Sequence, residues 1–416
     1  MTDVRAYSRH VRTACGAFLN LVILLVCSTA ALTVPAYAEE PVPTPPPESQ
    51  PTTQPDSQPT TTSTTTTTTS SETEKEEKKD EYLAILNGRV VTVSGPVLQK
   101  ASVLCKNGKI VEIADSIVVP AECTVIDAAG KWIYPGLVAA SAGGIHGGGK
   151  PDDTTDVFSL NMTVALAGGI TSAIAGNDAA KLTYGTTDGM IIDRNVFLDI
   201  NRNWRGATAY AEFRADLQKV RAYLRDLAKH KIDKEDDKEA KPPEKDWLKG
   251  KYEQYLKLLN REVTAVASAN QSQELIRLAE LAEEFDFRLV IRGGYEAWIV
   301  PSALARADVG IILTPRTIIE ADERQNRNTG SSIETAKILA DHGITVAIVP
   351  ATSRIGFSGL AGRDLLHLNM EAAFAVRGGM TNEQAVRAIT LDAARILGVD
   401  KRVGSIEVGK DADLIV

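Results

Sequence analysis

Histidine, cysteine and aromatic residues are scarce in this sequence of 416 residues. It contains five histidines and four cysteines, and aromatic residues make up 5% of it. The histidines beyond the first 38 residues are far apart along the chain, at His146, His230, His342 and His367. A metal centre that activates water brings several histidine or carboxylate ligands together. Four scattered histidines therefore do not predict such a centre.

An excess of basic residues is also missing. The chain has 46 Lys and Arg against 54 Asp and Glu, a net charge of −8, and acids are interleaved through its most basic segment, 219–257. Because a nucleic-acid-binding surface needs a dense positive patch, we expect no binding to nucleic acid. After Thr33 no apolar run reaches the roughly 20 residues of a spanning helix, so we expect no membrane span beyond that point.

The N-terminus has the pattern of a secretory signal peptide. Three arginines precede an apolar stretch at 17–33, and an Ala-x-Ala cleavage site follows at 36–38. We therefore predict a signal peptide over residues 1–38 and an exported protein, periplasmic or extracellular. The alternative is an uncleaved N-terminal membrane anchor.

A low-complexity segment follows over residues 39–81. It is rich first in proline and then in threonine, and it ends in a mixed-charge patch. Such a segment has almost nothing to bury against the entropy of ordering, so we predict a disordered linker. It would hold the folded part away from a wall or membrane, which also leaves open a stalked surface-binding protein.

Two cysteines, Cys105 and Cys123, remain beyond the signal peptide. In an exported chain an even pair is compatible with a disulfide. The alternative is two small buried side chains on neighbouring strands, and the sequence leaves the choice open.

The body of the chain predicts two structural parts. Short β-rich runs with Asn-Gly turns at 87–88 and 107–108 predict hairpins over residues 82–131. Between 132 and 401, strands alternate with helices, the pattern of a parallel α/β architecture. We expect a TIM-type (β/α)8 barrel over 132–401, with a small β-sandwich composed of 82–131 and 402–416. A capping box, Thr381 with Gln384, begins a helix expected over 382–397.

The run Lys131–Ser141 resembles the first barrel strand of the amidohydrolase superfamily, which reads Pro-Gly-Leu-Ile-Asp and then His-x-His. Pro135, Gly136 and Leu137 match that pattern. Ala139 stands at the position of the family's aspartate, and Ser141 and Gly143 stand at its two histidines. The resemblance covers roughly residues 83–416 and is nearest to the imidazolonepropionase-like branch. Family members continue for several strands beyond the position of Val416, which leaves open whether the chain is truncated.

The other metal-binding positions that the resemblance implies are substituted as well. Ser268 and Asn270 stand where the branch has a second His-x-His, before the helix that ends in Ala-Glu-Glu-Phe. Gly293 stands at the histidine of its His-Gly-x-Glu, of which only Glu296 is kept. Ala351 best matches the metal-binding, proton-accepting aspartate. Serine, glycine, alanine and asparagine do not supply the ligand field that activates water, so no metal is predicted, or Zn if this alignment is wrong.

Polar residues near the same strand ends predict a pocket instead. Its candidate residues are Ser141, His146, Ser268, Asn270, Arg292, Glu296 and Arg354. Two arginines suit an anionic ligand. The alternative is that the arginines pair with Glu296 or Asp322 as structural fillers.

The leading hypothesis is an exported, metal-free relative of hydrolases that act on C–N bonds other than peptide bonds, with a binding or scaffold role. Its partner would be a small molecule or an active paralogue, and it could form homo- or hetero-oligomers. The rival is an active hydrolase of cyclic amides or dipeptides. The carboxylates it could recruit are Asp152, Asp153, Asp156, Asp188 and Glu296.

Overall fold

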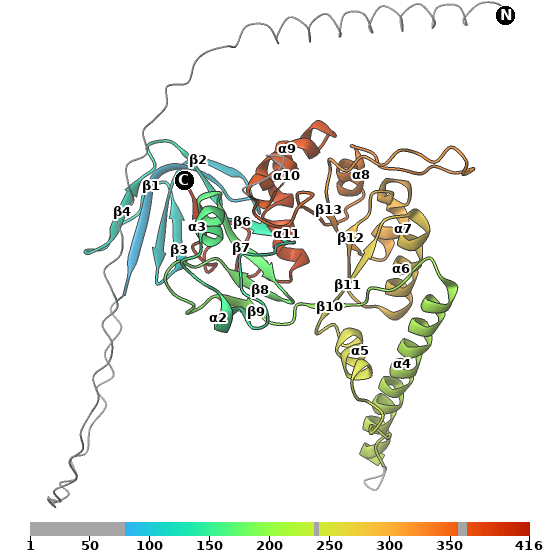
Figure 1. Cartoon of the computed structure of the whole chain (residues 1–416). Coiled ribbons are helices and arrows are strands. Elements are labelled where there is room, and N and C mark those ends of the chain that lie inside the picture. Colours follow the sequence, from blue (N-terminus) through green and yellow to red (C-terminus); the bar gives the residue numbers. More distant parts are fainter. Residues whose placement is uncertain (1–79, 237–240, 357–363) are drawn as a thin grey trace, which may run out of the picture. The chain divides into compact units, whose positions relative to one another are not determined.

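The computed structural model describes residues 80–236, 241–356 and 364–416 (Figure 1). The expected signal peptide and all but the last two residues of the expected linker lie outside the described residues. Over the described ranges, no helix combines the length and the apolarity needed to cross a membrane.

The N-terminal strands form a six-stranded sheet that the end of the chain completes. Its order is β15-β5-β1-β2-β3, with β4 paired to β1. The last strand, β15, runs antiparallel to β5 and brings Leu414 beside Pro135. The bounds are β1 Tyr82–Val91, β2 Val97–Lys106, β3 Lys109–Ala114, β4 Thr124–Asp127, β5 Trp132–Pro135 and β15 Leu414–Ile415. The expected return of the C-terminal segment to this sheet is therefore present.

Only one of the two Asn-Gly pairs forms the predicted hairpin turn. Asn107 and Gly108 both have positive φ and join β2 to β3. The prediction for Asn87-Gly88 is wrong, because β1 runs straight through that pair with a shift in register. A Cβ on Gly88 would overlap the side chain of Ile133, so β5 requires glycine at this bulge.

The two cysteines are free thiols: Cys105 lies in β2, and Cys123 immediately precedes β4, which does not neighbour β2. Leu83 of β1 pairs with Cys105 on one side and with Thr124, next to Cys123, on the other. Two strand spacings of about 4.8 Å exceed the roughly 7 Å between Cα atoms that a disulfide spans. Both earlier alternatives, a disulfide and neighbouring strands, are therefore wrong.

The remaining strands form two sheets within an α/β arrangement. One has the order β6-β7-β8-β9, with β6 and β7 parallel and the others antiparallel; the second, β10-β11-β12-β13-β14, is parallel throughout. The expected alternation of strands and helices is confirmed, but in the described part of the chain the strands do not close into one ring. The bounds are β6 Leu137–Ala139, β7 Ile170–Ala175, β8 Asp178–Lys181, β9 Ile191–Asp193, β10 Phe197–Asp199, β11 Thr264–Ala269, β12 Leu289–Gly293, β13 Gly310–Leu313 and β14 Val346–Ile348.

Both sheets contribute to a single apolar interior. The backbone N–H of Gly143, beyond β6, donates to the carbonyl of Ser353, beyond β14, at 2.8 Å, and links the two sheets. The side chains that share the interior are Val138, Ile174, Phe197, Val266, Val290, Ile312 and Ala347. Alternate residues such as Ile291 face the helices instead. Side chains two positions apart on a strand share a face. Ser268, two positions after Val266 in β11, and Arg292, two positions after Val290 in β12, therefore face the same interior at the carboxyl ends of the strands.

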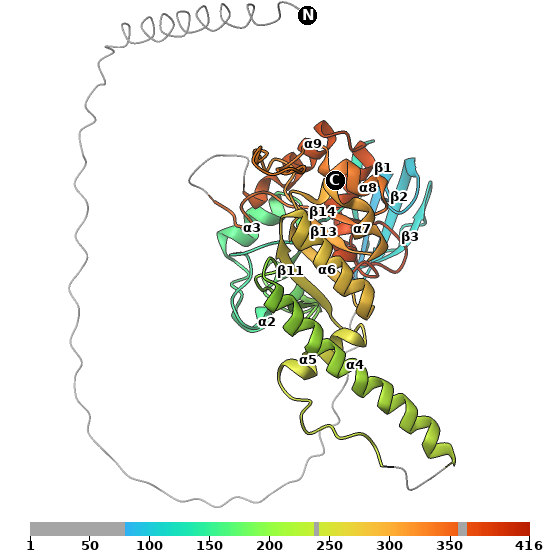
Figure 2. The same cartoon turned by 90° about the vertical axis from the view of Figure 1, so that its right-hand side faces the viewer.

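Helices cover the outer face of the parallel sheet, and Figure 2 shows that the longest, α4, projects beyond the others. The capping box of Thr381 and Gln384 is confirmed, but the helix expected over 382–397 is broken before Leu391. The bounds are α2 Pro151–Thr154, α3 Leu160–Ala167, α4 Ala207–Asp236, α5 Lys251–Leu259, α6 Ser272–Phe285, α7 Pro301–Arg306, α8 Thr335–Asp341, α9 Leu368–Arg377, α10 Asn382–Ala388 and α11 Leu391–Ile396, with single 3-10 turns η1 Ala297–Ile299 and η2 Leu365–His367.

Candidate functional site at the carboxyl ends of the parallel strands

The ends of β11 and β12 bring four predicted site positions together. Ser268 is the register partner of Arg292, and Ala269 is the partner of Gly293. Gly293 has φ +104°, and a Cβ built on it would overlap the side-chain oxygen of Asn270. These residues are therefore neighbours at the carboxyl ends of two adjacent strands.

Arg292 is a mostly enclosed cation at this site. Its guanidinium lies 5.5 Å from the ring centroid of Phe197 in β10. Its Nε atom is buried and has no hydrogen-bond partner among the described residues. Burial lowers the pKa of Arg292, and the charge of Asp199 opposes that shift.

Asp199 and Asn201 also belong to this site, and the sequence reasoning missed both. The carboxylate of Asp199 accepts hydrogen bonds from the backbone and the side chain of Asn201, at 2.7 and 3.0 Å. The side-chain oxygen of Asn201 in turn accepts from the backbone N–H of Ser268. The available signal was Phe197-Leu198-Asp199, an apolar pair followed by an acid, but three residues are too few to show a strand period.

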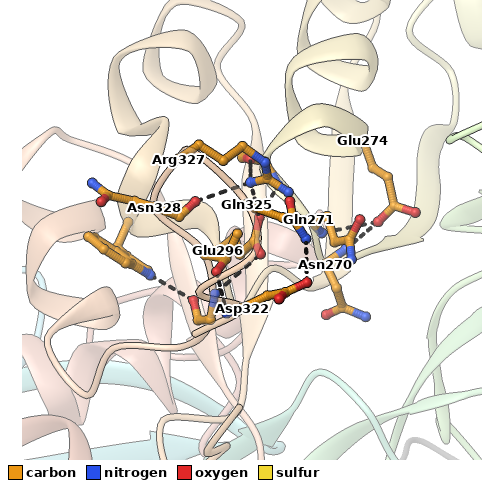
Figure 3. A network of polar contacts seen from close by, with 12 residues as sticks. Asn270, Gln271, Glu274, Glu296, Asp322, Gln325, Arg327 and Asn328 are labelled. Atoms are coloured by element: carbon orange, nitrogen blue, oxygen red, sulfur yellow. Dashed lines mark hydrogen bonds and ion pairs between the residues drawn. The ribbon is translucent and has the colours of Figure 1, made fainter. Parts of the chain in front are cut away.

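Glu296 does not line the site with Arg292; it anchors the loop that follows β13 (Figure 3). It is 2% exposed, and its carboxylate accepts from the backbone N–H groups of Ser272 at 2.8 Å and Gly330 at 3.3 Å. Arg327 pairs with it at 3.1 Å. Burial alone would raise the pKa of Glu296, but these donors outweigh burial and lower it. The prediction that Glu296 lines the pocket is wrong, because its carboxylate is bound by Ser272, Gly330 and Arg327, which lie beyond the strand ends.

The suggested pairing of the arginines with Glu296 or Asp322 is also wrong. Glu296 pairs with Arg327, while Asp322 accepts from Arg324 at 2.9 Å and from Gln325 at 3.1 Å. These hydrogen bonds lower the pKa of Asp322 to about 2.

Arg354 lies across the gap between β6 and β14. A Cβ on Gly143 would lie 3.4 Å from Cγ of Arg354, so Arg354 borders the space that a side chain at position 143 would enter. Ala351 is exposed just beyond β14, and Ser141 is half-buried just beyond β6. These positions carry no imidazole or carboxylate.

His146 lies against β8, contrary to its expected place in the mouth. Its Nε2 donates to the carbonyl of Lys181 at 3.0 Å, and Lys181 is paired with Ser172 in the first half of β7. Burial lowers the pKa of His146 despite that hydrogen bond. The imidazole is therefore a neutral, enclosed side chain away from the strand ends.

The carboxylates considered for recruitment have other partners or lie outside this site. Asp152 pairs with Arg194 at 2.7 Å, and Asp156 accepts from the backbone N–H of Phe158 at 2.9 Å. Asp153 approaches Lys150 at 4.0 Å, and no contact joins Asp188 to Arg292 or Ser268 among the residues described. These acids do not converge on one reacting position.

The donors at the strand ends do not fit a catalytic metal. They are hydroxyl and amide groups from Ser141, Ser268 and Asn270. The carboxylate of Asp199 is hydrogen-bonded to Asn201, and that of Glu274 accepts from the backbone N–H groups of Asn270 and Gln271. Within ranges 80–236, 241–356 and 364–416, no three His, Cys, Asp or Glu side chains group in a way that could hold an ion. A water-activating metal needs several such ligands, so no metal-dependent step is derived from these residues.

Comparison with known proteins finds similarity to amidohydrolases. Residues 301–416 match the amidohydrolase family. The chain is 24% identical over 384 residues to an imidazolonepropionase of Sphingopyxis alaskensis, covering 79% of this chain and 90% of that protein. A second imidazolonepropionase, from Thermoplasma volcanium, is 30% identical over 107 residues, covering 26% of this chain and 23% of that protein.

The fold agrees with these similarities. The structure of an amidohydrolase from Thermotoga maritima superposes with a TM-score of 0.60 at 24% identity, covering 80% of this chain and 93% of that one. This chain is therefore similar to amidohydrolases in sequence, most clearly over residues 301–416, and shares their fold.

Proposed function

We propose that this protein is a metal-free member of the superfamily that binds a small molecule at the carboxyl ends of a TIM-type barrel and does not hydrolyse it. The single observation that carries this proposal is the set of donors at the strand ends. The positions where the resemblance expects metal ligands hold Ser141, Gly143, Ser268, Asn270, Gly293 and Ala351. A neighbouring side chain can replace one lost metal ligand, but neighbours cannot replace the ligands lost at four separate strand ends.

The spaces around two of these positions support the same proposal. The side chain of Asn270 occupies the space in front of Gly293, and Arg354 borders the space in front of Gly143. A cation beside position 143 would repel a bound metal ion. In this proposal, Asn270 and Arg354 occupy or border the space that the family's metal ligands would fill. The barrel then keeps a binding role, either alone or together with an active paralogue. We further propose that the protein is exported and works outside the cytoplasm.

Metal content tests the proposal directly. The full purified chain would be dialysed after exposure to Zn²⁺ and Mn²⁺, and its metal measured by elemental mass spectrometry. We expect no stoichiometric metal and no change in thermal unfolding on adding Zn²⁺. A stoichiometric ion that survives dialysis, together with a higher unfolding temperature than the chelator-treated protein, would refute the metal-free site.

A second candidate function is hydrolysis of a C–N bond in a cyclic amide. The observation that favours it is the match to an imidazolonepropionase over most of both chains. Turnover of cyclic amides or dipeptides by the chelator-treated chain would establish it, whereas ligand stabilisation without turnover would favour the binding role.

A further inference from the structure

Arg292 lacks the partner that an enclosed cation normally has. Its Nε is buried without a hydrogen bond in the described ranges, and its guanidinium contacts the face of Phe197 at 5.5 Å. No described carboxylate forms an ion pair with it within 4.0 Å. The aromatic contact offsets part of the desolvation of the charge but does not replace a hydrogen-bonded counterion.

The nearest acid is engaged elsewhere. Burial lowers the pKa of Arg292 and the charge of Asp199 only partly opposes that shift, while the hydrogen bonds to the carboxylate of Asp199 come from Asn201. Asp199 therefore reduces the positive potential at the site, but it does not satisfy the hydrogen-bond donors of the Arg292 guanidinium. A site of this kind suits one negative charge, because a ligand with two would meet repulsion from Asp199.

Two further polar groups flank Arg292 on the neighbouring strand end. Ser268 is its register partner, and its exposed hydroxyl makes no hydrogen bond among the described residues. Asn270 follows two residues later, and Figure 3 shows its side-chain amide directed away from the network around Glu296. The guanidinium of Arg292, the hydroxyl of Ser268 and the amide of Asn270 thus place three hydrogen-bond donors at the same strand ends.

The geometry points to Arg292 as the anchor for the carboxylate of a small organic acid, with Ser268 and Asn270 donating to the same ligand. A planar guanidinium matches the two oxygens of a carboxylate. Arginine also pairs with phosphate, but the second negative charge of phosphate would be repelled by Asp199. This inference rests on the proposed binding function and adds the class of ligand.

Binding of matched probes to the full purified chain tests the inference. Isothermal calorimetry and ligand-observed NMR would compare the monocarboxylates N-acetylglycine and butyrate with the neutral N-acetylglycinamide and with inorganic phosphate. We expect saturable binding of at least one carboxylate, with the amide and phosphate about tenfold weaker or more. Phosphate binding more tightly than both carboxylates, or no saturable binding of either carboxylate, would overturn the inference.

Variants locate the binding to Arg292. Arg292→Met should reduce carboxylate affinity about tenfold or more, and Ser268→Ala several-fold, because a charged donor contributes more than a neutral one. Arg306→Met is the matched control, since Arg306 is exposed on α7 and only approaches Glu283 at 3.9 Å. Equal affinity of Arg292→Met and wild type would refute the assignment.

Thermal unfolding without ligand gives a readout that does not depend on the choice of probe. If Arg292 serves a ligand, Arg292→Met should unfold at the same temperature as wild type or higher, because binding sites carry unpaired groups at a cost in stability. A clearly lower unfolding temperature would make Arg292 a structural filler. Metal analysis of the same sample separates the two proposals, because bound metal overturns the metal-free site while failed carboxylate binding overturns only this inference.

Discussion

The side-chain oxygen of Asn270 occupies the space into which a side chain at Gly293 would project. In the proposed alignment these two positions stand at two metal-binding histidines of the family, and in this chain they are packed against each other. Gly293 also has φ +104°, a conformation that residues with a Cβ rarely adopt. The pair is therefore adjusted to the absence of a side chain at position 293.

Replacing Gly293 by alanine should destabilise the protein by about 1–3 kcal/mol, through backbone strain and overlap with Asn270. Urea unfolding would measure the loss. The double variant Asn270→Ala, Gly293→Ala should recover only part of it, because the positive φ remains. Gly148→Ala is the control, since a Cβ there meets nothing within 4 Å. Equal stability of Gly293→Ala and wild type would show that the site has room for a larger residue.

Glu296→Gln should loosen the loop between β13 and α8. The glutamine loses the charge that pairs with Arg327 and can present only one acceptor atom to the N–H groups of Ser272 and Gly330. We expect a loss of about 2 kcal/mol in the free energy of unfolding. Hydrogen exchange should become faster over residues 319–331. Glu283→Gln, on the exposed face of α6, is the control, and unchanged exchange would contradict the anchoring role.

The sequence predicted correctly those structural features that depend only on neighbouring residues. The Asn107-Gly108 turn and the Thr381 capping box need only neighbouring residues, and both are present. Asn87-Gly88 carries the same turn signal, but contact with Ile133 of another strand makes it a bulge. The direction of Glu296 is likewise set by Arg327, 31 residues away. The convergence of Ser268, Asn270 and Gly293 was accessible only through the family resemblance, because period-2 alternation does not show which strands are adjacent.

Asp411 should make the stability of the protein depend on pH in the acid range. Burial alone would raise the pKa of Asp411, but contacts with Lys109, Lys181 and Arg402 lower it from 3.8 to about 2. A carboxylate with a lowered pKa in the folded state stabilises fully above its unfolded pKa and loses that contribution as pH falls through the folded pKa. The stabilisation from Asp411 should therefore decline between pH 3.8 and about 2.

Asp411→Asn provides the test. At neutral pH we expect a loss of about 2–3 kcal/mol, because three cations lose a buried partner. The difference from wild type should shrink as pH falls below 3.8. Urea unfolding at a series of pH values would measure it. Asp153→Asn is the control, because its side chain is 64% exposed and only approaches Lys150. A difference that stays constant down to pH 2 would mean that Asp411 is not charged in the folded protein.

The two thiols should react at very different rates, because they lie in different environments on either side of β1. Cys105 is 2% exposed, and burial together with the charge of Cys123 raises its pKa to about 11. Cys123 is half-buried and donates only to the carbonyl of Thr124. Since the thiolate is the reactive form, iodoacetamide at pH 8 should alkylate Cys123 in the native protein and Cys105 only after unfolding. Peptide mapping by mass spectrometry would separate the two sites. A Cys105–Cys123 disulfide peptide in the non-reduced digest would contradict the strand order β4-β1-β2 that holds them apart.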